Sequence, residues 1–399
     1  MKTVLERMSE INAEERIAAF RQAQRLPYEA KVSRARLRAY TFRDECWKRD
    51  LNFHVSVGGL DSIVLYVFLH KIGVKAPGIS VSSLENKSNQ AVHKLLGIEP
   101  LKPAMRKDGK RWSKVKVLQE LGFPVISKEK AAKIALLQNP SEKNKTVRHA
   151  IITGETGEYG GNRKGTRMKL PQKWLELFGG YENENEGVNY GKPPEYIKAS
   201  SDCCYYLKEK PCDDWAKEHN SVPFLGFMAS EGGRREKGLM INGCNYFGKT
   251  TIRSAPFAVF MRQDLLRLAL EMDEYYKTTL RYEIAEERGV DVSELLPSII
   301  PTAYGEIAEN SKGELYTTKA QRTGCNICGF GIHLESRPHR FDRLHESNLK
   351  EWRYWMFDCC TKPNGEKFGW GEVLTYIGVP WEFDSDGRMI DLDGQISLF

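Results

Sequence analysis

The sequence lacks a long apolar run, and it does not open with a positively charged leader followed by an apolar stretch. A helix that crosses a bilayer needs about 20 mostly apolar residues, so no membrane span and no membrane partner are expected. A secreted disulfide scaffold is not expected either, because the chain has 9 cysteines in 399 residues and no such leader. These absences favour a protein of the reducing cytoplasm.

The cysteines that are present form short motifs. Cys203 and Cys204 are adjacent, and Cys325 and Cys328 form a Cys-x-x-Cys pair. In a reducing compartment such a pair is more often a metal or redox site than a disulfide, because the two-residue spacing lets both sulfurs point at one centre. Sites made only of thiolates take zinc or an iron–sulfur cluster.

Other cysteines and histidines give weaker signals. Cys46 and Cys212 are interpreted as small apolar core residues. His333, His339 and His345 follow the Cys-x-x-Cys pair, but their spacing does not match a zinc finger, so a polar helical or loop surface is expected for them.

Length and charge limit the remaining choices. A chain of this length with 41% hydrophobic residues can bury a full core, as one large domain with attachments or as two domains. The formal charge of +7 permits an anionic ligand but does not by itself indicate nucleic acid. Basic residues are concentrated in 102–116, where a solvated loop is the usual interpretation and the neighbouring Trp112 keeps a polynucleotide partner open.

The pattern of apolar residues indicates an α/β fold. Residues 1–50 are rich in Glu, Arg, Ala and Leu, so a helical extension is expected there, with an amphipathic helix over 13–25. From residue 51, short apolar strands alternate with helical segments, which is typical of a parallel sheet covered by helices. The predicted strands are 53–57, 78–82 and 124–126, and the predicted helices are 63–72 and 87–96.

A glycine-rich loop separates the first strand from the first of these helices. It reads Gly58-Gly59-Leu60-Asp61-Ser62. A strand, a glycine-rich loop and a helix in this order direct unpaired backbone N–H groups and the positive end of the helix dipole at an anion. Glycine lets a phosphate approach the main chain, and Ser62 offers a hydroxyl donor. An ordinary tight βα turn is the alternative for a Gly-Gly pair alone, so Asp61 and Ser62 favour a phosphate site.

Residues 57–62 resemble the pyrophosphatase loop, Ser-Gly-Gly-x-Asp-Ser, of the adenine nucleotide α-hydrolase superfamily, whose members bind ATP or a sulfonucleotide and act at the α-phosphate or its attached group. Residues 203–211 are similar to the Cys-Cys-x-x-x-Lys-x-x-Pro segment of sulfonucleotide reductases, and 324–328 to their second cluster motif. Together these motifs resemble the phosphoadenosine phosphosulfate (PAPS) reductase family, in a long form like those of phages and mobile elements. Further similar segments are 84–85, 228–235, 254–257 and 262–266.

This resemblance implies a doubly wound parallel sheet of the adenine nucleotide α-hydrolase kind, with a helical N-terminal extension and a cysteine-containing C-terminal region. The implied segments are an extension over 1–50, a nucleotide-binding α/β domain over 51–275 and a C-terminal region over 276–399. The implied cofactors are a [4Fe-4S] cluster and ATP or PAPS, with Mg²⁺ as a further candidate.

The resemblance also implies roles for individual residues. Catalytic cations would be Lys208 and Arg234. Residues that bind the nucleotide would be Ser56, Gly58, Gly59, Asp61, Ser62, Glu85 and Arg235, and the cluster ligands would be Cys203, Cys204, Cys325 and Cys328.

Three departures from the family pattern affect these expectations. Val57 replaces the first serine of the loop, and a lost hydrogen bond to a charged group costs roughly 1.5–3 kcal/mol. Whether the hydroxyl of Ser56, one position earlier, replaces this donor is left open. Cys244 lies between the two cluster motifs and is an alternative to Cys203 as fourth ligand. Sulfite-forming reductases use a cysteine near the C-terminus, but the last residues, 391–399, contain no cysteine. The nearest cysteines, at 359–360, are interpreted as structural.

Three functions are consistent with the sequence. The first is reaction at the nucleotide α-phosphate, of the ATP pyrophosphatase or sulfur-transfer type. The second is reduction of PAPS or its relatives to sulfite with a thioredoxin-like reductant. The third is a non-catalytic nucleotide-binding accessory protein of a phage, plasmid or CRISPR-type defence system, with a nucleic-acid-modifying complex as a candidate partner.

Overall fold

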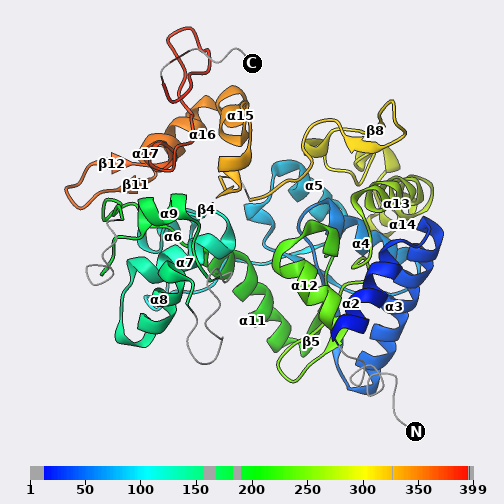
Figure 1. The fold of residues 1–399 in the computed structure, drawn as a ribbon. Coiled ribbons are helices and arrows are strands. Elements are labelled where there is room, and N and C mark those ends of the chain that lie inside the picture. Colours follow the sequence, from blue (N-terminus) through cyan, green and yellow to red (C-terminus); the bar gives the residue numbers. More distant parts are fainter. Residues whose placement is uncertain (1–12, 156–167, 183–189, 326, 394, 396–399) are drawn as a thin grey trace. The chain divides into compact units, whose positions relative to one another are not determined.

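The computed structural model describes residues 13–155, 168–182, 190–325, 327–393 and 395. They form two compact units, and each unit combines two separate stretches of chain (Figure 1). The first unit comprises residues 1–102 and 210–326, and the second comprises 103–209 and 327–399. The middle stretch, 103–209, lies within the segment expected to bind nucleotide, yet it packs with the C-terminal residues.

The first unit is built around a mostly parallel sheet. Its six strands lie in the order β3-β2-β1-β5-β7-β6, and only the edge strand β6 runs antiparallel. The α/β class is therefore confirmed. The strands of this unit are β1 Asn52–Ser56, β2 Gly78–Ser80, β3 Glu99–Pro100, β5 Ser221–Phe224, β6 Asn245–Phe247 and β7 Ile252–Ser254, with a separate hairpin of β8 Ile307–Glu309 and β9 Leu315–Thr317. Its helices are α2 Ala13–Gln24, α3 Tyr28–Lys48, α4 Leu60–Lys71, α5 Lys87–Leu95, α11 Lys210–Glu218, α12 Gly233–Asn242, α13 Arg262–Tyr275 and α14 Arg281–Arg288.

Helices cover both faces of this sheet. Adjacent residues of a strand point to opposite faces, so Phe53 and His54 of β1 mark the two sides. Phe224 of β5 contacts Phe53 and also Phe42 of α3, with ring centroids 5.7 and 4.8 Å apart. On the other face, Trp215 of α11 lies 5.2 Å from the ring of His54. A sheet covered on both sides explains why the three central residues of β1, Phe53 to Val55, are all buried.

The order of strands places one loop at a special position. From β1 the chain adds β2 and then β3 on one side, whereas β5 and β7 lie on the other side of β1. The strand order thus reverses between β1 and β5. In open parallel sheets, ligands bind at the carboxyl ends of the strands at such a reversal. The glycine-rich loop follows β1 directly, so it lies at this edge.

The predicted elements near this loop are confirmed with small shifts of their ends. β1, α4, β2 and α5 correspond to the strands and helices expected over 53–57, 63–72, 78–82 and 87–96. Helix α5 begins after Asn86, whose side chain accepts a 2.9 Å hydrogen bond from the amide of Ser88. In the expected N-terminal extension, the described residues form α2 and α3.

One strand prediction is wrong in its placement. The apolar run 124–126 forms β4 (Val125–Ile126), but this strand pairs with β10 (Gly329–Phe330) and does not join the main sheet. The strand that pairs with β2 at the edge of the main sheet is the short strand β3. Both of its residues are exposed, so no apolar pattern marks it in the sequence. Apolarity marks β4 as buried, but it does not say in which core.

The second unit is a smaller mixed assembly around its own core, in which Phe123, Trp370 and Phe341 are almost fully buried. Its strands are β4, β10, β11 Cys360–Thr361 and β12 Lys367–Phe368. Its helices are α6 Lys114–Glu120, α7 Lys128–Gln138, α8 Lys145–Thr153, α9 Gln172–Phe178, α10 Asp202–Cys204, α15 Arg340–Ser347, α16 Leu349–Arg353 and α17 Trp370–Tyr376.

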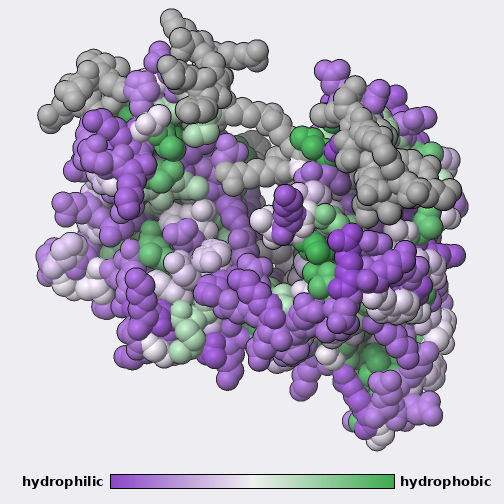
Figure 2. Space-filling model, turned by 90° about the horizontal axis from the view of Figure 1, so that it is seen from below, coloured by the Kyte–Doolittle hydropathy of each residue, from purple (hydrophilic) through white to green (hydrophobic). Residues whose placement is uncertain are grey.

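The surface gives no indication of a membrane-spanning segment. Among the described residues, no helix is both long enough and apolar enough to cross a bilayer. Hydrophilic residues predominate on the face shown in Figure 2, and the hydrophobic ones there occur in small groups.

Burial of His54 makes the stability of the first unit depend on pH. The His54 side chain is 1% exposed, and its Nδ1 lies 2.8 Å from Ser221 Oγ. Burial, with a smaller effect of His219, lowers the pKa of His54 to about 4. The unfolded chain has the higher pKa, about 6.5, so it takes up a proton first as the pH falls. The stabilisation is complete above pH 6.5 and is lost as the pH falls through 4.

We therefore predict that His54 removes about 3 kcal/mol from the free energy of unfolding between pH 6.5 and pH 4. Urea denaturation at a series of pH values measures this loss. His54→Asn keeps a polar group near Ser221 but does not titrate, so its stability should depend less on pH over this range. His149→Asn, at an exposed position, is the control and should behave like the wild type. Equal pH dependence in the wild type and His54→Asn would contradict the prediction.

Candidate functional site

The candidate site is the phosphate loop, residues 57–62, between β1 and α4. The chain that follows β5 packs directly on it. A Cβ atom at Gly226 would lie 2.9 Å from the carbonyl carbon and oxygen of Asp61 and from the amide nitrogen of Ser62. Only glycine permits this approach, so the loops on the two sides of the strand reversal are in backbone contact.

Hydrogen bonds within the loop fix its shape. The amide of Gly58 donates to Ser62 Oγ at 2.7 Å, and the Ser62 hydroxyl donates to the carbonyl of Gly59 at 2.9 Å. The amide of Ile63 also donates to Gly59, at 3.1 Å. In this conformation the Ser62 hydroxyl holds the loop together, and its proton is not directed at a ligand.

A tyrosine from far along the chain covers part of the loop. The amide of Leu60 donates to the Tyr304 hydroxyl at 3.0 Å, and this hydroxyl lies 2.7 Å from Thr323 Oγ1. Asn89 Nδ2 donates to the same threonine oxygen at 2.9 Å. A Cβ at Gly59 would lie only 2.6 Å from the Tyr304 hydroxyl oxygen. The second glycine of the loop therefore makes room for the chain's own tyrosine.

Two loop amides remain open. Among the residues that the structure describes, no acceptor is bonded to the amide of Gly59 or to that of Asp61. Both groups belong to the start of α4, a 12-residue helix whose dipole is positive at this end. The loop can therefore bind an anion through backbone donors.

Acidic and basic side chains gather beside these amides. Arg262, the first residue of α13, places Nη1 3.3 Å from Asp61 Oδ1. Glu231, in the segment after β5, hydrogen-bonds to Asp61, and Arg322 Nη2 lies 3.8 Å from Glu231 Oε1. Burial raises the pKa of Asp61 to about 6, Arg262 opposes this effect, and Glu231 adds to it. The two carboxyl groups and two guanidinium groups form a set that can bind a divalent cation and phosphate oxygens.

Two further side chains lie beside Gly58. A Cβ at Gly58 would lie 3.6 Å from Glu85 Oε1, and Glu85 is 3% exposed. His93 Nε2 donates to the carbonyl of Gly58 at 2.8 Å, and its Nδ1 accepts from Ser82 Oγ at 2.9 Å. The structure thus brings Glu85 to the loop as expected, and it adds His93, which the sequence did not indicate.

The residues before the loop belong to the sheet. Val57 is 5% exposed in the core of the first unit, and its amide donates to the carbonyl of Ile79 at 2.9 Å. Ser56 is the last residue of β1 and pairs with the same isoleucine. At the position where the family has a serine, this chain therefore packs an apolar side chain.

The expected cations lie on separate elements. Arg234 and Arg235 belong to α12 in the first unit, but their side chains lie outside the described part of the structure. Lys208 lies in a π-helical turn over Tyr205–Glu209 in the second unit and is half-buried. Arg262 and Arg322 are the arginines that the structure places beside the loop. In the sequence, Arg262 belongs to the similar segment 262–266, whereas Arg322 lies in no motif.

The residue segments that flank the two cysteine motifs bond to the short strand β4 and the residues just before it. Cys203 is buried and Cys204 half-buried, both in α10 of the second unit. The amide of Ser200, just before this pair, donates to the carbonyl of Phe123 at 3.0 Å. The amide of Gly331, just after Cys328, donates to the carbonyl of Ile126 at 2.8 Å. The segment 123–126 therefore connects the surroundings of both motifs.

Their side chains do not form a recognisable metal site in the structure. Cys325 and Cys328 are both half-buried. Cys325 belongs to the end of the first unit, and Cys328 belongs to the second. Within the described residues, no three His, Cys, Asp or Glu side chains are gathered as a metal-binding group. Ile327, inside the motif, has φ +61°, which is unfavourable for a β-branched residue. The thiolate donors suit an iron–sulfur cluster in kind, and their gathering at one centre stays a prediction.

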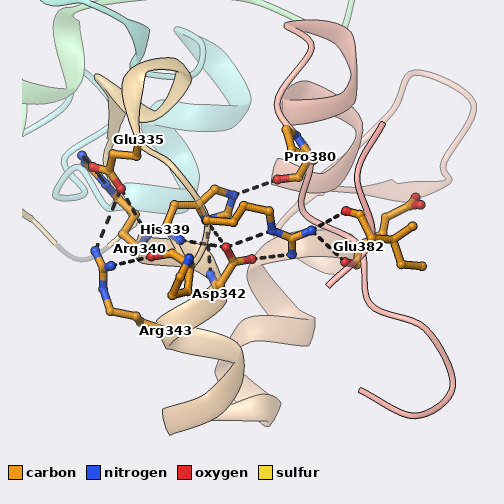
Figure 3. A network of polar contacts seen from close by, with 10 residues as sticks. Glu335, His339, Arg340, Asp342, Arg343, Pro380 and Glu382 are labelled. Atoms are coloured by element: carbon orange, nitrogen blue, oxygen red, sulfur yellow. Dashed lines mark hydrogen bonds and ion pairs between the residues drawn. The ribbon is translucent and has the colours of Figure 1, made fainter. Parts of the chain in front are cut away.

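The segment after this motif is fixed by a buried polar network (Figure 3). Arg340 pairs with Glu335. It also donates to the carbonyl of Cys328 at 2.7 Å. His339 Nε2 donates to the carbonyl of Pro380 at 2.8 Å, and its Nδ1 accepts from the amide of Asp342 at 3.3 Å. Burial holds the pKa of His339 below its ordinary value. The expected polar surface is therefore wrong for His339, which is 1% exposed and begins helix α15.

The remaining cysteines mostly behave as core residues. Cys46 is fully buried, as expected, and burial raises its pKa to about 12. Cys359 and Cys360 are also buried, and their mutual hydrogen bond with burial raises the pKa of Cys359, as expected for a structural pair. Cys244 is 5% exposed in the core of the first unit, where burial raises its pKa against the effect of Arg38. Cys212 is only half-buried, so the expected position in the core is wrong for it.

Comparison of the chain with protein-family models, with curated proteins and with solved structures finds no match. The chemistry of the site therefore has to be inferred from its own residues and from the resemblance of its motifs.

We predict that Tyr304→Phe increases the affinity of the protein for inorganic pyrophosphate. The variant keeps the buried ring but removes the hydroxyl that accepts from Leu60, so a third loop amide becomes open. The lost hydrogen bond should lower the free energy of unfolding by about 1 kcal/mol. Isothermal titration calorimetry and urea denaturation measure the two effects. Tyr282→Phe, at an exposed tyrosine of the same unit, is the control. Weaker pyrophosphate binding by Tyr304→Phe would instead make the hydroxyl a ligand.

Proposed function

We propose that the chain binds an adenine nucleotide with its phosphates on the loop 58–62 and acts at the α-phosphate, as ATP pyrophosphatases and sulfur-transfer enzymes similar to the PAPS reductase family do. One observation carries the proposal. The glycine-rich loop lies where the strand order of a parallel sheet reverses, and it presents the open amides of Gly59 and Asp61. Both features favour a phosphate-bearing ligand.

The finer fold is part of this proposal. The order β3-β2-β1-β5-β7, with helices on both faces, supports a doubly wound sheet of the adenine nucleotide α-hydrolase kind. In such a sheet the base and ribose lie along the carboxyl ends of the strands while the phosphates reach the loop.

The side chains beside the loop would act mainly through charge. The open amides and Arg262 would hold phosphate oxygens and neutralise the negative charge that develops on a pyrophosphate leaving group. Asp61 and Glu231 would hold Mg²⁺, which commonly takes one or two carboxylates together with substrate phosphates and water. Bound there, the ion would polarise the phosphoryl oxygens. Glu85 and Ser56 would border the nucleotide, and Lys208, Arg234 and Arg235 would supply further cations, as the resemblance implies.

The [4Fe-4S] cluster is proposed on the resemblance and on the donor chemistry of Cys203, Cys204, Cys325 and Cys328. When bound, it would supply a redox-active or sulfur-bearing centre. The chain's contribution would be to fix the second motif through Arg340, which bonds the carbonyl of Cys328.

A second candidate function is nucleotide binding without chemistry. It is favoured by the hydroxyl of Tyr304 on the Leu60 amide and by the commitment of the Ser62 hydroxyl to the loop itself. Both contacts reduce the donors available to a transition state. Such a protein would be an accessory component of a phage, plasmid or CRISPR-type defence system.

The test is performed on anaerobically purified protein. Equilibrium binding of Mg²⁺-ATP and of PAPS is measured first, and the release of AMP, pyrophosphate and sulfite is then followed, with a thioredoxin-like reductant in the sulfite assay. AMP and pyrophosphate support the main proposal, binding without products supports the accessory function, and sulfite identifies a sulfonucleotide reductase. Failure to bind either nucleotide overturns the proposal. Iron and sulfide analysis should find about four irons per chain, and a protein without iron would rule out the proposed cluster.

A pair of glycine variants tests the loop itself. We predict that Gly59→Ala weakens ATP binding at least tenfold, or by about 1.4 kcal/mol, because its Cβ would lie 2.6 Å from the Tyr304 hydroxyl oxygen and force the loop or the tyrosine to shift. Gly238→Ala adds a methyl group where the nearest atom is 3.7 Å away, so it serves as the matched control. Unchanged binding by Gly59→Ala would place the nucleotide elsewhere.

A further inference from the structure

A basic hairpin opens the second unit. Residues 103–116 contain six lysines and arginines and one aspartate. Met105 pairs with Arg111 across the hairpin, the amide of Arg106 donates to Lys110 at 2.7 Å, and Gly109 turns the chain with φ +77°. The hairpin is therefore an ordered feature that presents positive charge.

Two of the positive charges at its tip, those of Lys107 and Lys110, have no carboxylate partner among the described residues. Arg106 pairs with Asp108 and Glu120 at 3.1 and 3.0 Å. Lys107 and Lys110 are exposed, and within the described part of the chain no carboxylate lies within ion-pair distance of either. Two exposed lysines without a carboxylate partner on one short turn suit an anionic partner.

Aromatic rings continue from the hairpin along the same unit. The Trp112 ring lies 4.8 Å from that of Tyr206, which lies 5.0 Å from Tyr205. A second group of rings contains Trp355, and Lys114 Nζ lies 5.9 Å from the centre of its ring.

This second group ends at an exposed tyrosine. The Trp355 ring lies 5.3 Å from that of Tyr354. Tyr205 and Tyr354 are 44% and 42% exposed, so each of the two groups reaches solvent at a tyrosine. We call the following five rings the aromatic track: Tyr205, Tyr206, Trp112, Trp355 and Tyr354.

Contacts with the backbone hold the hairpin against the track. The amide of Ala104 donates to the carbonyl of Tyr206 at 3.0 Å, and the amide of Trp112 donates to Ala104 at 2.9 Å. Arg106 lies 4.8 Å from the centre of the Trp112 ring. The hairpin, its cation Arg106 and the rings of Trp112 and Tyr206 are therefore held together.

We propose that the hairpin and the aromatic track bind single-stranded nucleic acid. Unpaired bases stack on aromatic rings, and the phosphates between them pair with lysine and arginine. A duplex keeps its bases stacked inside and cannot use the rings in this way. An acidic protein would use the lysines but has no need of exposed tyrosine faces. The residues of this surface all belong to the second unit, and none is part of the phosphate loop. The inference does not depend on the proposed reaction.

The test is fluorescence anisotropy of the full chain with labelled oligothymidine, oligouridine and a DNA duplex, at increasing salt concentration. Lys107→Glu together with Lys110→Glu should weaken binding of the single strands roughly tenfold or more and reduce the slope of log affinity against log salt by about two. The matched control, Lys143→Glu with Lys145→Glu, reverses two exposed charges elsewhere in the same unit and should bind like the wild type.

The aromatic contribution is tested separately. Tyr205→Ala should weaken binding of the single strands about tenfold, whereas Tyr282→Ala, at another exposed tyrosine, should have no effect. A preference for oligothymidine or for oligouridine identifies the natural strand as DNA or RNA. Three results would overturn the inference: no binding of single strands by the wild type, tighter binding of the duplex, or binding that depends on the lysines but not on Tyr205 and is displaced equally by polyglutamate.

Discussion

The close approach of two backbone segments at the carboxyl edge of the main sheet is the constraint on which the candidate site depends. Gly226, after β5, lies against the peptide that joins Asp61 to Ser62, and any side chain there would push the two loops apart. This contact brings the segment that carries Glu231 to the phosphate loop. It also limits the loop to a conformation in which the amides of Gly59 and Asp61 remain open. A single glycine outside the recognisable motif thus determines the shape of the site.

Charge balance at this edge follows from burial. An aspartate in a phosphate loop would repel an anion if it were fully ionised and unpaired. Here burial raises its pKa to about 6, Glu231 shares a hydrogen bond with it, and Arg262 and Arg322 lie beside the pair. Because the two carboxyl groups pair with the two guanidinium groups, this set of side chains can accept a phosphate with its counter-ion or remain neutral without one. The hydroxyl of Tyr304 occupies the amide of Leu60, which could otherwise donate to a phosphate. Tyr304 is therefore the residue of the site that most directly opposes ligand binding.

Local parts of this arrangement could be predicted from the sequence, and distant ones could not. The strand, the glycine loop and the helix are consecutive in the chain, so apolar periodicity and glycine placement are sufficient to locate them. Tyr304 and Thr323 reach the loop across more than half of the sequence, and neither lies in a motif. Strand β4 was assigned to the wrong sheet because its apolar residues indicate burial but not a partner. His339 was expected on a surface because a histidine's spacing does not reveal whether its ring bonds a carbonyl such as that of Pro380 in a core.

Hydrogen–deuterium exchange of the peptide that contains residues 57–63, measured with and without Mg²⁺-ATP, tests the central claim most directly. If phosphates bind the open amides, exchange of this peptide should slow when nucleotide is added, and the effect should be lost in Gly59→Ala. Peptides from α8, which belongs to the second unit, provide an internal reference. Slowed exchange confined to other segments, or no change at any nucleotide concentration, would show that this loop is not the nucleotide site.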